Sequence, residues 1–400
     1  MCATLHLKAS LEIEARQCIK MKAEDLKEAQ EYVTDIFAEL RHLFKWQLLA
    51  AFTCFYLAYV LGDFSLAYFI LCGAGFALLI CTNYNSLQVA QDGRAVLITG
   101  CDSGYGYGLA KKLHAIGFTV FAGCLDEKSN GAIELKRFDQ ATGQLHVIRM
   151  DVTNQEDVDK ALEYVKDNLP VQGLWSVVNN ASQSCCTGFL EWTSNEAYEK
   201  VMSVNLFGVI RVTNAFLPLI RKSQGGIVNV SSILNRTPSP FNGPFTITKG
   251  AIESYSAILR LEMKRFNVQV VVVEPGNFTD ALNFNSDKFN FSRTVRRMWD
   301  QLDDQLRMDY GNNCVEKQIE IGQMAMELSE KDTSAVVNAM AQSIAQLRPK
   351  DRYIIASPSE KVVAYAIQCL PNWMTDHLIL ALETNTSLSN LSGFEPFIII

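Results

Sequence analysis

Residues 226–249 combine a hydroxyl, an aromatic ring and an amine at a fixed spacing. The apolar residues at the start of this stretch predict a buried strand that ends close to Ser232. Phe245 comes thirteen residues after Ser232, and Lys249 comes four residues after Phe245, where a helix is predicted to begin. A hydroxyl and an amine can exchange protons or hydrogen bonds with a ligand, whereas a phenylalanine ring cannot. The stretch therefore combines two polar side chains that could handle protons with an aromatic ring that cannot.

A glycine-rich segment, residues 100–108, separates a predicted strand from a predicted helix. It reads GCDSGYGYG and directly follows an apolar run that ends at Thr99. Glycines let the backbone approach a pyrophosphate, and the N-terminus of the next helix supplies N–H donors and positive potential. The pattern predicts a nucleotide-phosphate site made of these residues: Thr99, Gly100, Ser103, Gly104, Tyr105 and Gly106.

Strands and helices alternate along residues 94–358 and must position both groups of residues. We predict seven apolar strands, over 95–99, 119–122, 146–149, 174–179, 226–231, 269–274 and 353–355. Helices are predicted over 108–116, 131–141, 155–168, 194–222, 245–266 and 333–346. Short continuous apolar strands joined by helices are typical of a parallel sheet covered on both faces. Residues 277–330 interrupt the alternation, and we interpret them as an insertion over the ligand crevice, a substrate lid.

Three short motifs follow the third, fourth and sixth predicted strands: Asp151-Val152, Asn179-Asn180-Ala181 and Pro275-Gly276. With the glycine spacing Thr-Gly-x-x-x-Gly-x-Gly, they resemble the short-chain dehydrogenase/reductase family over about residues 94–380. The resemblance implies a Rossmann fold, an α/β doubly wound parallel sheet of seven strands with helices on both faces. Ser182 departs from the family pattern, which has glycine at this position.

Several longer stretches resemble D-3-hydroxybutyrate dehydrogenase most, in the branch with the retinol and 17β-hydroxysteroid dehydrogenases, among them VLITGCDSGYGYGLAKKLHAIGFTVFAGCLDE, VVVEPGNF and MDYGNN. This resemblance implies NAD(P)-dependent oxidoreduction of a secondary alcohol or ketone, with a hydroxy acid or a small lipophilic molecule as substrate. In the family, Asn, Ser, Tyr and Lys form one proton relay. Asn205, Ser232 and Lys249 match three of these positions, and Phe245 stands at the position of the tyrosine.

The missing phenol leaves two functional hypotheses. General acid–base catalysis is worth about 10²–10⁴-fold in rate, so its loss would impair a dehydrogenase that still binds cofactor. Tyr255 lies about 15 Å further along the predicted helix, and Tyr105 and Tyr107 lie at the phosphate end, so the sequence offers no replacement. The first hypothesis is an impaired, membrane-anchored oxidoreductase. The second is an inactive protein that binds nucleotide or ligand as a membrane scaffold or sensor.

The resemblance also assigns cofactor contacts beyond the glycine turn: Asp151, Val152, Asn179, Ala181, Lys249, Pro275, Gly276 and Thr279. Asp126, just after the second predicted strand, is expected to bond the ribose hydroxyls of NAD and to repel the extra phosphate of NADP. We therefore predict NAD, with NADP as the alternative.

Residues 46–82 contain one charged residue, Asp63, which with Gly62 separates two apolar runs. A spanning helix needs roughly 20 residues, so a membrane hairpin of two spans is preferred over one tilted span or a buried helix pair. Arg41 and Lys45 flank the first run and favour the cytoplasmic side, so a hairpin would place the large domain in the cytosol. The remaining segments are a charged amphipathic N-terminal segment, a polar linker and an apolar C-terminal extension: 1–45, 83–93 and 359–400.

The amino-acid composition limits the kinds of binding partner and the redox compartment that we expect. The formal net charge is −7, which gives no indication of nucleic-acid binding. The eleven cysteines and five histidines show no metal-ligand spacing, so we predict no metal site and reduced thiols in a reducing compartment. By resemblance, we expect a homodimer or homotetramer formed through the helices over 194–222 and 245–266. The relatives point to the endoplasmic reticulum or the mitochondrial membrane.

Overall fold

The structure is a computed structural model, which describes residues 73, 87–139, 142–183, 188–237, 241–278, 288–311, 313–327, 329–377 and 379. Residues from Gln88 onward form one compact unit. The predicted N-terminal segment and membrane hairpin lie outside the described residues, apart from Gly73. Those two predictions, with the end of the C-terminal extension, stay predictions.

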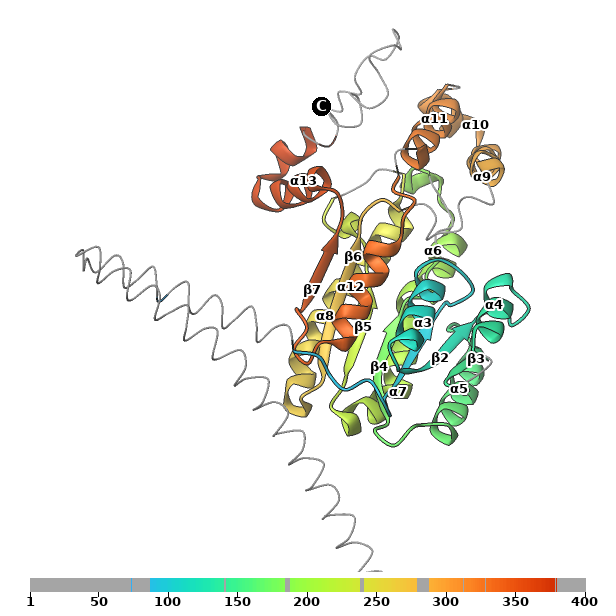
Figure 1. The fold of residues 1–400 in the computed structure, drawn as a ribbon. Helices are drawn as coiled ribbons and strands as arrows, with labels where there is room; N and C mark the ends of the chain where they lie inside the picture. The colour runs from blue at the N-terminus through green and yellow to red at the C-terminus, as the bar shows by residue number, and fades with distance from the viewer. Residues whose placement is uncertain are drawn as a thin grey trace, which may run out of the picture. The chain divides into compact units, whose positions relative to one another are not determined.

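Seven parallel strands form one sheet in the order β3-β2-β1-β4-β5-β6-β7 (Figure 1). The strands are β1 (Ala95–Thr99), β2 (Thr119–Cys124), β3 (Leu145–Arg149), β4 (Leu174–Asn179), β5 (Gly226–Val230), β6 (Gln269–Pro275) and β7 (Arg352–Ile355). The predicted parallel α/β sheet of seven strands is confirmed. Its strand order reverses direction between β1 and β4, which is where doubly wound sheets bind ligands.

Successive residues of a strand point to opposite faces of the sheet. Both faces here are apolar, and helices cover both of them. Val96 and Ile98 of β1 pack in one apolar core, under α3 (Gly104–Ala115), α4 (Asn130–Phe138) and α12 (Ser334–Ala345). Ala95 and Leu97 pack in a second core, under α5 (Gln155–Asp167), α7 (Val209–Ser223) and α8 (Gly243–Met263). All four strand side chains are fully buried, which explains why the strand appears in the sequence as a continuous apolar run.

The helix predicted over 194–222 is not continuous α-helix. It consists of α6 (Asn195–Met202), a π-helical turn (Ser203–Gly208) and α7. By length and composition alone the stretch Asn195–Ser223 could cross a membrane. However, Val212, Phe216 and Ile220 are buried against the sheet, so this apolar face belongs to the core.

The insertion after β6 is helical, with α9 (Lys288–Asp300), α10 (Asp304–Tyr310) and α11 (Cys314–Glu327). Helices α9 and α11 share a small apolar core of their own, built from Phe291, Val295, Val315 and Ile319. An aromatic cluster joins α9 and α10 to the domain, since the Trp299 ring lies 5.2 Å from Trp192 and the Tyr310 ring 4.8 Å from Phe189. Figure 1 shows these helices gathered beyond one end of the strands.

Short elements complete the described chain. Three 3₁₀ turns, η1 (Leu190–Trp192), η3 (Ile233–Asn235) and η4 (Lys264–Phe266), lie at connections and helix ends. Helix α13 (Pro358–Cys369) follows β7 and begins with a capping box formed by Ser357 and Glu360.

Candidate functional site

A pocket of about 850 Å³ opens at the carboxyl ends of the strands. It is lined by residues that follow six of them: Gly100, Leu125, Met150, Asn180, Ser231 and Gly276. Ala325 of α11 lines it from the insertion. The volume falls in the usual range for ligand sites, and the place is the switch point of the sheet.

The glycine segment forms a compact turn that only glycine allows at two positions. Gly100 has φ of +71°, and a Cβ there would lie 2.8 Å from the Cα of Ala181. A Cβ at Gly106 would lie 2.2 Å from the carbonyl oxygen of Gly100, so the first turn of α3 packs directly on the segment. The sequence places no acidic residue in that first turn. Ser103 and Tyr105 line the pocket, so the α3 N-terminus can bind an anion there.

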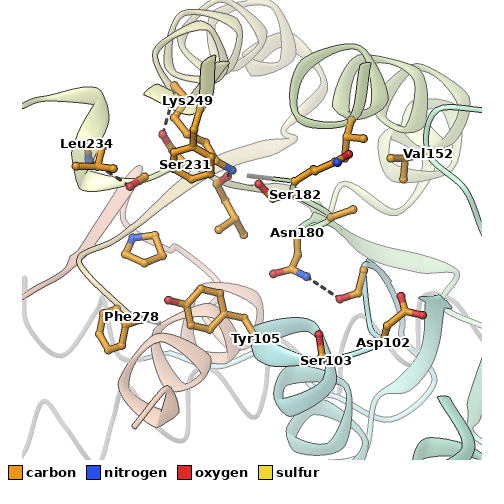
Figure 2. A pocket seen from close by; sticks show the side chains of 18 of the residues that line it. Asp102, Ser103, Tyr105, Val152, Asn180, Ser182, Ser231, Leu234, Lys249 and Phe278 are labelled. Atoms are coloured by element: carbon orange, nitrogen blue, oxygen red, sulfur yellow. Dashed lines mark hydrogen bonds between the residues drawn. The ribbon is translucent and has the colours of Figure 1, made fainter. Parts of the chain in front are cut away.

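Thr99 positions the neighbouring loop instead of lining the pocket. Its buried hydroxyl donates to the Val178 carbonyl and accepts from the backbone N–H groups of Asn180 and Ala181, both at 3.0 Å. The Asn180 side chain returns two hydrogen bonds, to the carbonyls of Thr99 at 2.9 Å and Gly100 at 3.0 Å. These bonds tie the ends of β1 and β4 together at the switch point, and Figure 2 shows Asn180 at the pocket wall.

Asn179 does not line the pocket, although the sequence assigned it to the cofactor site. Its buried side chain donates to the Thr213 hydroxyl at 3.0 Å and to the Asn229 carbonyl oxygen at 2.8 Å. Asn229 in turn donates to Ser256 at 2.8 Å. These bonds cross the core between β4, β5, α7 and α8, so Asn179 holds the sheet to its helices. The next residue of the same motif, Asn180, which was not among the predicted cofactor contacts, is the one that lines the pocket.

Two carboxylates line the pocket beyond β2. Asp102 accepts hydrogen bonds from the backbone N–H groups of Leu125 at 2.9 Å and Asp126 at 3.0 Å. Asp126 also lines the pocket, and one of its oxygens accepts from the Lys128 N–H at 2.8 Å. Asp102 was not among the predicted cofactor contacts, although it lies inside the glycine segment. A group with two negative charges would meet both carboxylates here.

The other predicted cofactor residues divide between the pocket and its surroundings. Five of them line it: Asp151, Val152, Ala181, Pro275 and Gly276. Gly104 and Gly106 lie in the first turn of α3, outside the pocket lining. Thr279 lies outside the described residues. Glu360 of α13, which the sequence analysis did not select, lines the pocket beside Gly276 and accepts from the Asn277 N–H at 3.0 Å.

Ser232, Phe245 and Lys249 are brought together at the β5 side of the pocket, all three at least nine-tenths buried. The Lys249 amine donates to the Val230 carbonyl at 2.9 Å and lies 5.2 Å from the centre of the Phe245 ring. Burial lowers the pKa of Lys249 to about 8. The Ser232 oxygen accepts from the Leu234 N–H at 3.2 Å, which leaves the hydroxyl proton for a ligand.

Asn205 lies in the π-helical turn, buried behind the pocket wall. Its carbonyl oxygen accepts from the Gln183 N–H at 2.7 Å and from the Ser182 hydroxyl at 3.3 Å. Its amide donates to the Gln183 carbonyl at 2.9 Å and to Thr248 at 3.1 Å. Asn205 therefore connects the loop after β4 to the helix that carries Lys249. Ser182, the departure from the family pattern, lines the pocket and joins this network.

A buried ion network holds the loop that follows Ser232. Glu274 of β6 is fully buried and pairs with Arg236, 2.9 Å from Nη2, and with Arg352. Arg236 also donates to Gln368 of α13 at 2.7 Å. Asn235 donates to the Ser232 carbonyl at 2.6 Å. The loop position thus depends on β6, β7 and α13.

Tyr105 and Tyr107, the tyrosines near the phosphate end, make contacts of their own. Among the residues described as lining the pocket, Tyr105 is the single tyrosine. Its ring packs edge-on against Phe278, and burial raises its pKa. The Tyr107 hydroxyl bonds Glu134 at 2.6 Å. Within the described part of the chain, no group of three or more His, Cys, Asp or Glu could hold a metal.

Known proteins resemble this chain over the domain that holds the pocket. The family model described as short chain dehydrogenase matches residues 94–289. Mitochondrial D-beta-hydroxybutyrate dehydrogenase of Rattus norvegicus is 42% identical over 273 residues, which cover 68% of this chain and 79% of that protein. Estradiol 17-beta-dehydrogenase 2 of Mus musculus is 35% identical over 311 residues, which cover 78% of this chain and 80% of that protein. Retinol dehydrogenase 16 of Homo sapiens is 35% identical over 284 residues, covering 71% and 87%.

The fold is shared with solved structures of much lower identity. A short chain dehydrogenase/reductase from Burkholderia phymatum in complex with NAD matches with a TM-score of 0.56 at 19% identity. The match covers 69% of this chain and 93% of that one. At such identity the likeness concerns the arrangement of strands and helices alone.

Proposed function

Because this chain belongs to the short-chain dehydrogenase family, we propose that it is an oxidoreductase that moves a hydride between a nicotinamide cofactor and a secondary alcohol or ketone. The observation that carries the proposal is a single pocket that joins the glycine turn to Ser232 and Lys249. The relatives act, by their names, on hydroxybutyrate, estradiol and retinol. We propose a substrate of one of these classes.

The residues present fit NAD. The close approach of Gly106 to Gly100 leaves the α3 N-terminus open toward a pyrophosphate. Asp102 and Asp126 would meet the adenosine ribose and would repel the 2′-phosphate of NADP. Lys249 would bond the nicotinamide ribose, and Asp151 and Val152 would lie at the adenine. When bound, the nicotinamide accepts or donates the hydride.

The catalytic side chains can orient a substrate but lack the usual acid. The free proton of Ser232 would bond the substrate oxygen, and Lys249 would place positive charge near it. Phe245 can neither give nor take a proton. We therefore propose slow turnover, reduced by about 10²–10⁴-fold relative to a site with a phenol.

Calorimetry and turnover assays on the purified protein test this proposal. We expect NAD to bind more tightly than NADP, and slow oxidation within a panel of hydroxybutyrate, steroid and retinoid alcohols. Failure of both nucleotides to bind would reject the proposal at its first step.

A second function, an inactive nucleotide or ligand sensor at a membrane, is favoured by one observation, the absent hydroxyl at Phe245. It predicts nucleotide binding with no turnover on any substrate in the panel. Measurable wild-type turnover that disappears in Lys249→Met would reject it.

We further propose that residues 46–82 anchor the protein to a membrane of the endoplasmic reticulum or mitochondria, with NAD and a small hydroxy-acid or lipophilic substrate as partners. The relative from Rattus norvegicus is mitochondrial by name. Alkaline extraction of membranes and protease protection would test the anchor and the side of the domain. We propose self-association through α7 and α8, where Ile258 and Leu261 are exposed apolar residues. Light scattering would test that assembly.

A further inference from the structure

We propose that the Lys249 amine captures apolar aldehydes as a covalent imine when cofactor does not fill the pocket. The capture is a binding activity separate from hydride transfer. It rests on Lys249 and the pocket, and only its competition with NAD rests on the proposed function.

Lys249 combines burial with access. Its side chain is 3% exposed, yet it lines a pocket of about 850 Å³. Lys200, the other lysine among the described residues that line the pocket, is exposed to solvent. The two amines therefore share the pocket and differ in solvation, which makes Lys200 a matched control.

The surroundings of Lys249 favour the neutral amine. The nearest polar contact is the neutral Val230 carbonyl, and none of the ion pairs found among the described residues includes Lys249. With a pKa of about 8, roughly a tenth of the amine is neutral at about pH 7, against roughly one in 3,000 for an ordinary lysine. A neutral amine has the lone pair that attacks a carbonyl carbon.

The Phe245 ring opposes this effect but does not cancel it. A cation–π contact at 5.2 Å would favour the ammonium by roughly one pKa unit. Roughly thirtyfold more neutral amine than in a solvated lysine still remains at about pH 7. The ring also forms an apolar wall, which suits an aldehyde with a hydrocarbon body.

Imine formation needs only groups that the protein and the aldehyde supply. The nitrogen lone pair forms a bond to the aldehyde carbon, and the Ser232 hydroxyl can donate to the aldehyde oxygen because its own acceptor site is used by the Leu234 N–H. One hydrogen of the amine moves to the aldehyde oxygen as the carbinolamine forms. The second hydrogen follows as the C–O bond breaks, so the oxygen leaves as water. A C=N bond results, with no oxidant or reductant consumed.

Trapping with benzaldehyde and sodium cyanoborohydride tests the capture on the full-length protein. We expect one reduced adduct by intact mass, located by peptide mapping at Lys249 and formed at least about tenfold faster than at Lys200. The adduct should vanish in Lys249→Arg and persist in Lys200→Arg. Equal labelling of both lysines, or none at Lys249, would overturn the proposal. Mapping of the wild type gives this answer even if a variant fails to fold.

Competition between NAD and the aldehyde distinguishes imine capture from the proposed oxidoreductase function. Saturating NAD should slow labelling of Lys249 and leave labelling of exposed lysines unchanged. An equal rate of Lys249 labelling with and without bound NAD would support capture and reject the cofactor position that we propose. Absence of labelling with normal NAD binding would reject capture alone.

Discussion

The two halves of the pocket are built differently. In the nucleotide half, after β1 and β4, the contacts are mostly backbone turns and bonds from Thr99 and Asn180 to main-chain atoms. In the half after β5, which we call the catalytic half, the chemistry that we propose depends on single side-chain atoms of Ser232 and Lys249. A binding surface made of backbone survives many substitutions, whereas a proton relay is lost with one oxygen. The chain can thus keep the first function while the second is impaired.

Phe245→Tyr gives the largest expected change. Restoring the phenol next to Lys249 should raise turnover by about 10²–10⁴-fold and leave the NAD dissociation constant unchanged, because Phe245 belongs to the catalytic half. Steady-state kinetics and calorimetry check both parts. Equal turnover of the two proteins would show that the wild type has another proton donor. The catalytic half would then not be impaired, and the proposed contrast between the two halves would be wrong.

The buried amine should make stability depend on alkaline pH. The pKa of Lys249 is lower in the folded state, about 8, than the ordinary 10.5, so the unfolded state binds more protons between these values. Stability should therefore rise with pH through that window, by up to about 3 kcal/mol, and be lost as pH falls through about 8. Urea unfolding of wild type and Lys249→Met checks this, since the variant should lack the rise. Lys200→Met should keep it, and parallel curves for wild type and Lys249→Met would contradict the assignment.

Gly106→Ala should damage the nucleotide half. Its Cβ would lie 2.2 Å from the Gly100 carbonyl oxygen, and overpacking costs about 1–3 kcal/mol. We expect weaker NAD binding by roughly tenfold or more and a lower melting temperature. Gly250→Ala is the control, because nothing lies within 4 Å of a Cβ there. Similar losses in both variants would mean that helix α3 does not depend on this close contact.

Asp126→Asn should produce the smallest effect, a change in cofactor choice. Removing one charge from the ribose corner should improve NADP binding relative to NAD by about 1 kcal/mol, roughly fivefold. Glu127→Gln is the control, because Glu127 pairs with Lys136 at 3.3 Å and is outside the described pocket lining. Unchanged NAD preference in Asp126→Asn would assign discrimination to Asp102.

The sequence predicted β1 and β4 to the residue because both strands are mostly apolar and are bounded by polar turns. It predicted one helix over 194–222, since the π-helical turn depends on contacts from distant residues. Asn205 bonds the loop at Gln183, and a Cβ at Gly208 would lie 2.8 Å from Val152. Periodicity along one helix carries no information about such partners.

The site residues also divide into those that the local sequence pattern could locate and those that depend on distant contacts. Asn179 and Asn180 are adjacent in the sequence, but strand alternation places Asn179 on the face of Val177, toward the core under α7. That signal was available and could have separated the two. Asp102 could not have been found this way, because its partners Leu125 and Asp126 belong to another strand end.

The network around Glu274 makes residues near the C-terminal end of the domain part of the support of the catalytic half. Gln368 and Glu360 of α13 hold the Ser232 loop and the β6 end, more than a hundred residues after Ser232 in the chain. A protein shortened before α13 would retain Asn205, Ser232 and Lys249 in its sequence. It would lose the Gln368 and Glu360 contacts, which help to hold the Ser232 loop and the β6 end, so a shortened chain could match the family motif with a less firmly held site.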